Sequence, residues 1–285
     1  MSRASAIAIA QAYFDDGPFL EDLRRRIGIP SSSQEPQRAA ALRLFERRVN
    51  ERKPAAYLVR EAWLGDFRFY VDERVIVPRS HIAELLREEL APWIEEPLEV
   101  RAALDLCAGS GCLAILLARA FPRAQIDAAD ISSSALSVAR INVKRYGLGA
   151  RIRLIESNLF SALGAKRYEL IVSNPPYVTA GGMRRLPREY RHEPRIALAG
   201  GRDGLAVVRK ILRAAAAHLA PRGLLVVEVG AGRRRIERAF PYIEFVWPET
   251  GAGHPVFFAT REQLLRWKTR KSLTTKDTKD TKRKQ

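Results

Sequence analysis

The chain has 285 residues, 47% of them hydrophobic and 28% charged, which are ordinary values for a globular protein of one large domain or two modest ones. This composition excludes wholesale disorder and collagen. No stretch approaches the ~20 apolar residues of a spanning helix, and two cysteines together with a poor secretory signal favour a reduced, cytoplasmic protein. The formal net charge of +17 favours contact with a polyanion such as RNA, but it equally fits an Arg-rich protein without such a partner.

The first part of the chain, up to about residue 53, has the apolar spacing of helices. Apolar residues recur at a helical period over 19–27 and again over 41–49, and Pro30 with the serines after it separates the two helices. After Pro54 the residues favour strands, so we expect a β-hairpin followed by an extended segment. The two strands of the hairpin are expected at 57–59 and 67–71, with a turn at Gly65-Asp66 between them. The extended segment is expected at 75–78.

From residue 80 onward, expected strands and helices alternate. Apolar strands separated by helices predict a mainly parallel sheet covered on both faces. The last two strands are linked only by 248–253, which suits an antiparallel pair. The expected helices are 81–91, 112–121, 132–146, 204–219 and 233–240, and the expected strands are 102–106, 125–129, 151–156, 168–173, 223–229, 243–247 and 255–260.

The C-terminal end has a different composition. Residues 274–282 repeat a three-residue unit without apolar side chains, a pattern typical of disorder. The last 18 residues hold eight basic and two acidic side chains. We therefore expect a disordered basic tail.

A glycine-rich turn joins the strand at 102–106 to the helix that follows. Gly109 and Gly111 allow a ligand to approach the backbone closely, and the helix N-terminus beyond them offers free N–H groups. Asp130 ends the next strand, where a carboxylate can accept hydrogen bonds from ribose hydroxyls. The pattern indicates a nucleotide-like ligand, and taken alone it would also fit a dinucleotide.

Three further residues accompany this turn. Asp105 precedes it, and an acid there suits a cationic ligand better than a pyrophosphate; the alternative is that it caps N–H groups of the loop. Cys107 and Cys112 lack the further Cys or His residues of a four-ligand zinc site. We interpret both cysteines as small packing residues and expect no metal.

The strand over 168–173 ends in Asn174-Pro175-Pro176-Tyr177. The prolines take the chain out of the sheet at its carboxyl edge, where the glycine turn also lies. The side-chain oxygen of Asn174 and the carbonyl of Pro175 could accept both N–H groups of a planar amino group, with Tyr177 stacked on its plane. Held in this way, a feeble nitrogen nucleophile can be aimed at an electrophile such as a sulfonium methyl group. The other interpretation is a turn that only ends the strand.

These residues carry a resemblance to a known family. The run from Asp105 to Gly111, Asp130 and the Asn-Pro-Pro-Tyr turn resemble the class I S-adenosylmethionine-dependent methyltransferases. More narrowly, they resemble the protein-(glutamine-N5) methyltransferases, which modify release factors or a ribosomal protein. Longer strings are similar to the branch acting on large-subunit ribosomal protein uL3, and the similarity covers about residues 45–265. These strings are 47–52 with 56–58, 69–74 with 77–80, and 186–194 with 203–205.

The resemblance implies a fold and a division of the chain. The fold is α/β, a Rossmann-like seven-stranded sheet whose last strand is antiparallel, with a small helical N-terminal domain joined by a β-hairpin. The implied parts are a helical substrate-recognition domain over 1–56, a hairpin connector over 57–79, the methyltransferase domain over 80–268 and a disordered basic tail over 269–285.

The resemblance also implies site residues. S-adenosylmethionine would be held by Asp105, Cys107, Gly109, Gly111, Asp130, Asn158 and Asn174. The glutamine amide of uL3 would be held by Asn174, Pro175, Pro176 and Tyr177, of which Asn174, Pro175 and Tyr177 are the catalytic residues. Asn158 departs from the Asp usual in the family near the adenine amino group, but an amide oxygen can still accept there.

Several functional alternatives remain at this point. The turn would also fit the exocyclic amino group of adenine in DNA or RNA, release factors are the other protein substrates of the family, and a non-catalytic RNA-binding factor could keep the fold. The aperiodic segment 178–201, with five arginines, is expected to be a functional loop beside the turn. We assign no general base to His192 or Glu193. A uL3 substrate on an assembling large subunit would bring ribosomal RNA into contact with the basic body.

Overall fold

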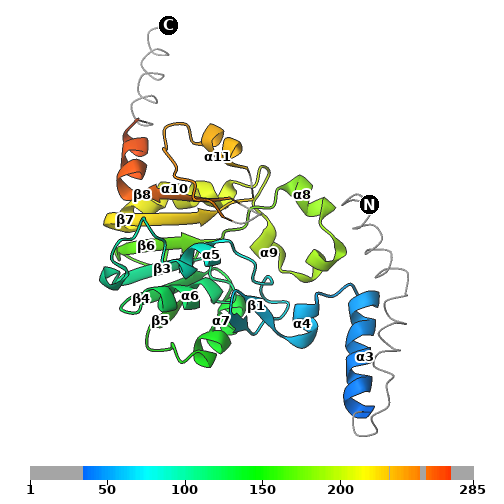
Figure 1. Ribbon diagram of the computed structural model, residues 1–285. Helices are drawn as coiled ribbons and strands as arrows, with labels where there is room; N and C mark the ends of the chain where they lie inside the picture. Colours follow the sequence, from blue (N-terminus) through cyan, green and yellow to red (C-terminus); the bar gives the residue numbers. More distant parts are fainter. Residues whose placement is uncertain (1–34, 231, 251–254, 271–285) are drawn as a thin grey trace.

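The structure is a computed structural model that describes residues 35–230, 232–250 and 255–270 (Figure 1). The helix expected over 19–27 and the tail beyond residue 270 lie outside the described residues. Residues 261–270 form a helix that runs two residues past the boundary expected at 268. Among the described residues no helix is long and apolar enough to cross a membrane.

The central element is a six-stranded sheet in the order β5-β4-β3-β6-β7-β8. All neighbouring pairs are parallel except the last, in which β8 runs antiparallel to β7. The strands are β3 (Ala102–Leu106), β4 (Gln125–Asp130), β5 (Ile152–Glu156), β6 (Tyr168–Ser173), β7 (Leu219–Glu228) and β8 (Val256–Thr260). This arrangement confirms the expected class I methyltransferase architecture.

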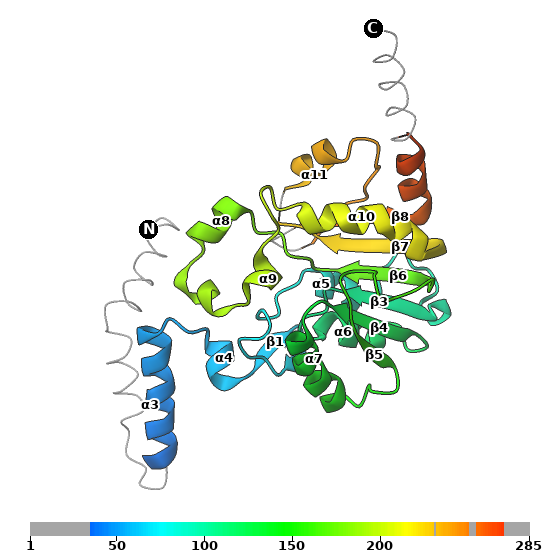
Figure 2. The same cartoon turned by 180° about the vertical axis from the view of Figure 1, so that it is seen from behind.

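Helices cover both faces of the sheet (Figures 1 and 2). One face packs against α5 (Ile82–Arg87), α6 (Cys112–Ala120) and α7 (Ser133–Arg145), and the other against α10 (Ala206–His218), α11 (Arg233–Ala239) and the helix over 261–270. Successive strand residues alternate between these two layers: Ala103 lies in the first and Leu104 in the second, and both are fully buried. Because both faces of the sheet are buried, its strands consist of nearly continuous apolar residues.

Residues 243–247 were expected to form a seventh strand, and this prediction is wrong. The segment makes a single antiparallel bridge, in which Val246 and Phe258 exchange both backbone hydrogen bonds at 3.1 and 2.8 Å. Pro248 follows immediately and has no N–H to extend the ladder. Phe245 and Trp247, on either side of the bridge, instead pack against Phe257 with ring centroids 4.5 and 5.8 Å apart. Aromatic packing therefore takes the place of strand pairing here.

The hairpin is also shifted from its expected place. Its strands are β1 (Ala62–Leu64) and β2 (Phe67–Phe69), joined at the expected Gly65-Asp66 turn, whereas the β-rich run at 57–59 belongs to the helix α4 (Ala55–Val59). Tyr57 is buried and its hydroxyl donates to the carbonyl of Val75 at 2.5 Å, a contact from outside the hairpin. Tertiary packing thus overrides the strand preference of a five-residue run.

The segment 178–201 is not one loop. It contains three short helical elements, α8 (Ala180–Arg185), η3 (Arg188–His192) and α9 (Arg195–Leu198). Two other elements complete the described chain, the helix α3 (Glu35–Asn50) and the turn η2 (Pro97–Glu99). In Figure 1, α3 stands outside the sheet domain, connected to it through α4.

The strand order places the expected site residues at one edge. β3 lies between β4 and β6, so the turn after β3, the end of β4 and the turn after β6 are neighbours at the carboxyl ends of the parallel strands. The strand order reverses at β3, and such a switch point is where open α/β sheets bind ligands.

Candidate active site

The turn after β3 forms the floor of the site. Cys107, Gly109 and Gly111 have positive φ angles of 65°, 54° and 76°. A Cβ on Gly109 would meet nothing within 4 Å, whereas a Cβ on Gly111 would lie 3.1 Å from the Cβ of Ala139 on α7. Gly109 therefore faces open space, and Gly111 lets α6 and α7 pack closely.

Asp130 is fixed by the same turn. Its Oδ2 accepts from the backbone N–H of Gly109 at 2.8 Å, and its Oδ1 accepts from Ser132 at 2.9 Å. Burial raises the pKa of Asp130, while these backbone hydrogen bonds oppose that shift. Each oxygen keeps a lone pair that can accept a hydrogen bond from a ligand.

A cavity of about 270 Å³ lies above this floor. Of the expected cofactor residues, Cys107, Gly109, Asp130, Asn158 and Asn174 line it. Apolar side chains such as Ile131 and Leu159 form part of its wall, beside the carboxylate of Asp130. The lining suits a ligand with both an apolar ring system and hydroxyl groups.

Two expected cofactor residues do not reach this cavity. Gly111 caps α6, and Asp105 is fully buried below the turn, where its Oδ2 accepts from the N–H of Ala114 at 2.8 Å. The other oxygen, Oδ1, has no hydrogen-bond partner among the described residues. Burial raises the pKa of Asp105 to about 7. Asp105 therefore accepts from a backbone N–H in the first turn of α6, rather than from the N–H groups of the loop that the alternative interpretation named.

The two cysteines are free thiols, of which Cys112 is buried and Cys107 lines the first cavity beside Asp130. Burial raises the pKa of both thiols. Cys112 belongs to the hydrophobic core, where a thiol is inert, and this fits its interpretation as a packing residue. Cys107 is instead part of the cavity lining.

The Asn-Pro-Pro-Tyr turn separates two cavities. A second cavity of about 370 Å³ lies beyond it and is lined by Pro175 and Tyr177. Asn174, Ile76 and Ala197 line both cavities, so they mark the junction between them. The Asn174 side chain and the Pro175 carbonyl make no hydrogen bond within the described part of the chain. Two acceptors thus remain available where the two cavities meet.

Three glycines that sequence reasoning did not single out hold Tyr177. A Cβ on Gly230 would lie 2.2 Å from the Tyr177 ring, and Cβ atoms on Gly200 and Gly204 would lie 2.6 and 2.4 Å from its backbone. The Tyr177 ring therefore occupies space that only glycine leaves free. The one available sequence signal was Gly230 directly after a buried strand.

Glu228 is a second residue that the sequence did not reveal. It is fully buried at the end of β7, where it accepts from the Ser80 hydroxyl at 2.7 Å and from the His81 N–H at 2.8 Å. The Tyr177 hydroxyl lies 3.4 Å from its other oxygen. Glu228 thus links the Asn-Pro-Pro-Tyr turn to the segment before α5.

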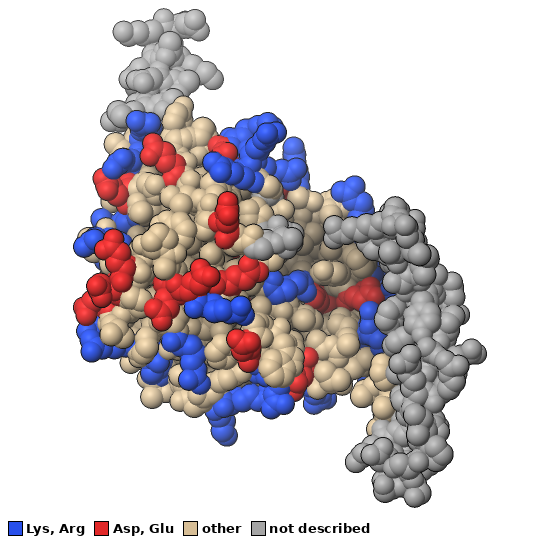
Figure 3. Space-filling view, in the orientation of Figure 1, with Lys and Arg blue, Asp and Glu red and all other residues tan. Residues whose placement is uncertain are grey.

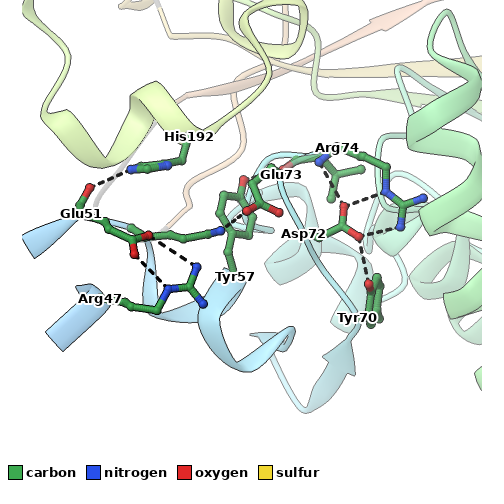
Figure 4. Close-up of polar contacts among 10 residues, drawn as sticks. Arg47, Glu51, Tyr57, Tyr70, Asp72, Glu73, Arg74 and His192 are labelled. Carbon is green, nitrogen blue, oxygen red and sulfur yellow. Dashed lines mark hydrogen bonds and ion pairs between the residues drawn. The ribbon is translucent and has the colours of Figure 1, made fainter. Parts of the chain in front are cut away.

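The connector between the N-terminal helices and the sheet closes the first cavity. Arg74, Val75 and Ile76 line that cavity. Figure 4 shows how Arg74 is held: Asp72 accepts from its guanidinium at 2.6 and 2.8 Å and from the Tyr70 hydroxyl at 2.9 Å. The Arg74 pair is the main reason that the pKa of Asp72 is lowered to about 2.

His192 and Glu193 are both engaged in structural contacts. The His192 ring lies 3.0 Å from the backbone carbonyl of Glu51, at the end of α3 (Figure 4). The buried carboxylate of Glu193 pairs with both terminal nitrogens of Arg79 at 2.6 and 2.7 Å. Arg79 in turn lies over the Tyr190 ring, 4.9 Å from its centre. Neither residue is presented as a general base.

Comparisons with known proteins identify the fold and the family of this chain. Residues 84–186 match the family model described as "Methyltransferase small domain". The chain is similar to two solved structures at a level that shows the fold. One is a methyltransferase from Pyrococcus furiosus, with TM-score 0.51 and 15% identity over 70% of this chain and 90% of that chain. The other is the hMettl16 catalytic domain in complex with MAT2A 3'UTR hairpin 6, with TM-score 0.53 and 13% identity over 79% of this chain and 82% of that chain.

Closer relatives come from sequence. The ribosomal protein uL3 glutamine methyltransferase of Bordetella pertussis is 57% identical over 229 residues, 80% of this chain and 77% of that protein. The protein of the same name from Neisseria meningitidis serogroup A is 55% identical over 232 residues, 81% of this chain and 76% of that protein. This chain therefore belongs to the family of the ribosomal protein uL3 glutamine methyltransferases.

Proposed function

We propose that this protein transfers a methyl group from S-adenosylmethionine to the side-chain amide nitrogen of a glutamine in ribosomal protein uL3. The observation that carries the proposal is the pair of unsatisfied acceptors at the junction of the two cavities, the Asn174 side-chain oxygen and the Pro175 carbonyl. The close relatives named for this reaction support the choice of substrate.

The first cavity fits the cofactor by its chemistry. Asp130 offers carboxylate lone pairs for ribose hydroxyls, and the exposed Asn158 amide stands at the rim where an adenine amino group would need an acceptor. Ile131 and Leu159 supply apolar surface for the adenine ring. S-adenosylmethionine, when bound, supplies a methyl group on a positively charged sulfur.

The second cavity would take the glutamine side chain. The primary amide has two N–H donors, and the turn offers the matching pair of acceptors in Asn174 and Pro175. An amide nitrogen is a feeble nucleophile because its lone pair is delocalised into the carbonyl. Holding both of its hydrogens fixes the nitrogen and aims the lone pair across the junction, and such orientation supplies much of the rate.

The protein contributes positioning and electrostatics to the transfer. Methylation makes the amide N–H acidic as the nitrogen gains positive charge, and acceptors already aimed at those hydrogens stabilise that charge. Tyr177 forms part of the cavity wall on which the amide plane can rest. Because His192 and Glu193 are engaged elsewhere, we assign the final proton to water.

The N-terminal helices have a supporting role in this proposal. α3 is tied to the segment 188–193 by Glu189, which pairs with Arg48 at 3.3 Å and with Arg52 at 3.0 Å. That segment leads into the wall of the second cavity. We propose that the helical part of 1–56 recognises the protein substrate. A ribosomal substrate would place this protein in the cytoplasm, with the large ribosomal subunit as a further partner.

A direct experiment tests the proposal. The protein is incubated with isotopically labelled S-adenosylmethionine and, separately, with purified uL3, a peptide chain release factor and ribosomal RNA, and the labelled residue is mapped by mass spectrometry. We expect label on one glutamine of uL3, and labelling about 10²–10³-fold slower with the Asn174→Ala variant. Label on the release factor would assign the protein to the other branch, and label on adenine would show that the turn holds a nucleobase.

A further inference from the structure

A third cavity, of about 560 Å³, adjoins the second one. Val178 and Leu186 line both, so the two cavities are continuous. Three arginines converge on the third cavity from α8, η3 and α9, namely Arg184, Arg191 and Arg195. All three are exposed, and they come from the arginine-rich segment that the sequence predicted to be a functional loop beside the turn.

The acidic and basic side chains of the segment 178–201 differ in whether they have ion-pair partners. Its two acids are already paired with arginines from outside the segment, Glu189 with Arg48 and Arg52, and Glu193 with Arg79. By contrast, Arg184, Arg191 and Arg195 have no ion pair within the residues that the structure describes. The acidic side chains of the segment therefore hold it to the rest of the protein, whereas these three arginines line the third cavity without an acidic partner.

The three arginines differ from other basic side chains in lining one cavity together. On the face shown in Figure 3, blue and red side chains interleave over the sheet domain. Some basic side chains have acidic partners, such as Arg209 with Asp203 and Arg233 with Glu237, and those of α11 without one line none of the three cavities. Three guanidinium groups around one hollow, without acids of their own, suit a ligand with several spaced negative charges.

The kind of polyanion that fits the third cavity follows from the charge of each partner. A ribosomal protein binds RNA and for that reason carries basic surface itself, so its surface would be repelled by three arginines and by a chain of net charge +17. The RNA to which such a protein is bound has the opposite charge. Phosphate oxygens also match the planar fork of arginine.

We propose that the arginine cavity, lined by Arg184, Arg191 and Arg195, binds the phosphate backbone of RNA that carries the protein substrate. This inference rests on the proposed function. Its consequence is selectivity: uL3 in contact with RNA is methylated in preference to free uL3, because the phosphates bind beside the cavity that takes the glutamine.

Binding to RNA alone tests the site without any turnover. The full chain is titrated into a fluorescent single-stranded RNA of about 20 nucleotides at several salt concentrations, as wild type and as the Arg184→Gln/Arg191→Gln/Arg195→Gln variant. Each phosphate contact adds about 0.7 to the slope of log affinity against log salt for a single strand. We expect the triple variant to lose about two units of slope, whereas an unchanged slope would overturn the proposal.

A matched control separates the site from net charge. Arg234→Gln/Arg235→Gln/Arg238→Gln removes the same charge from the exposed face of α11, and none of these residues lines the three cavities described above. This control should keep most of the slope. An equal loss in both variants would mean that only overall charge attracts RNA.

A kinetic ratio tests the selectivity. We compare kcat/KM for uL3 bound to a ribosomal RNA fragment with kcat/KM for free uL3. The cavity variant should lower this ratio about 10-fold or more at low salt, and the α11 variant should not. An equal fall for both forms of uL3 would instead indicate that the cavity takes an acidic segment of the protein. Failure to methylate any form of uL3 would contradict the proposed function and leave the RNA measurement standing.

Discussion

Asn174 and Pro175 are the residues proposed to hold the glutamine amide. Asn174 is half-buried and Pro175 is buried, and neither the Asn174 side chain nor the Pro175 carbonyl has a hydrogen-bond partner among the described residues. Asn174 lines both the first and the second cavity, and Pro175 lines the second. An acceptor kept free in such a place is available to a substrate.

Replacing Asn174 separates orientation from cofactor binding. We expect Asn174→Ala to lower kcat by about 10²–10³-fold, because one oriented hydrogen bond of this kind stabilises a transition state by about 2.7–4 kcal/mol. Cofactor affinity, measured by calorimetry, should change little. Asp130→Ala is the matched contrast and should weaken cofactor binding first, since its carboxylate holds the Gly109 turn at 2.8 Å. Equal losses of binding and turnover in Asn174→Ala would contradict the assigned role.

Asp105 gives the fold a dependence on pH. Burial raises its pKa to about 7, whereas an unfolded aspartate titrates near ~3.9. The folded state therefore holds a proton that the unfolded state releases, and the stability contributed by this proton is complete below about pH 4 and is lost as the pH rises through about 7. We expect Asp105→Asn to lack this fall in the free energy of unfolding, measured with urea between pH 4.5 and 8 without cofactor.

Asp127 supplies a control, because its pKa is shifted in the opposite direction from that of Asp105. Its carboxylate accepts from Arg153, Lys166 and the Tyr168 hydroxyl at 2.7–3.0 Å, and these partners lower its pKa against the effect of burial. Its stability contribution is present above about pH 4 and is lost as the pH falls. Asp127→Asn should therefore differ from wild type most at neutral pH. Parallel pH curves for wild type and Asp105→Asn would show that Asp105 titrates normally.

At the scale of elements, the site is assembled by contacts between segments that are distant in sequence. Tyr177 after β6 fits against glycines from the α9–α10 connection and from the end of β7. Glu228, also at the end of β7, holds the start of α5. The Asn-Pro-Pro-Tyr turn is rigid because these elements pack on it, in addition to the two prolines within it.

Gly230→Ala tests this packing. The added Cβ would stand 2.2 Å from the Tyr177 ring, so the ring must move, and overpacking of this kind costs about 1–3 kcal/mol. Because a shift of about 1 Å at a reacting group can cost about 10²-fold in rate, we expect kcat/KM to fall by that order. Gly232→Ala, two residues along, is the control because its Cβ meets nothing within 4 Å. Identical kinetics for the two variants would refute the packing argument.

The pair of Arg79 and Glu193 joins the connector to the segment after η3. Removing one partner of a buried pair costs about 3–5 kcal/mol, and since Arg79 is 35% exposed we expect Glu193→Gln to lie at the lower end of that range. The exposed pair of Arg233 and Glu237 should contribute less than about 1 kcal/mol, which makes Glu237→Gln the control in chemical unfolding. If Glu193 were instead a general base, its loss would remove the acidic limb of the pH–rate profile. We expect that profile to keep its shape.

For the whole molecule, the order of the strands decides where the site forms. Because β3 lies between β4 and β6, three turns from different parts of the chain meet at one edge. The connector residues 74–76 and the α9 region then close over that edge. The arginine cavity adjoins the second cavity, so the first cavity, the second cavity and the arginine cavity form one series.

Removal of residues 271–285 tests the expected tail. The repeat over 274–282 has no apolar side chain to bury, so we expect the truncated protein to keep its melting temperature and to change in unfolding free energy by less than about 0.5 kcal/mol. Differential scanning calorimetry checks both quantities. A clear destabilisation would mean that the tail packs on the body. Truncation at 260 is the contrast, since it removes Leu264 and Trp267, which are buried in the core.

The amino-acid sequence was enough to predict the fold class and the family, and the sheet order and the close relatives confirm both. Alternating apolar strands and helices, the Gly109 turn, Asp130 and the Asn-Pro-Pro-Tyr turn are local patterns, and local patterns are readable because each depends on the period or geometry of one element. The same patterns failed where distant contacts win. Tyr57 is helical because it packs on the connector, and Val246 makes one bridge because its neighbours prefer an aromatic cluster.

The enclosure of the candidate site is visible only in the folded chain. It placed Asp105 below the turn, set Gly200, Gly204 and Gly230 around Tyr177, and gathered three arginines at a third cavity. None of these features follows from spacing along the chain. Each depends on the distance between segments that meet only when the sheet has formed, and that distance is a property of packing rather than of local sequence.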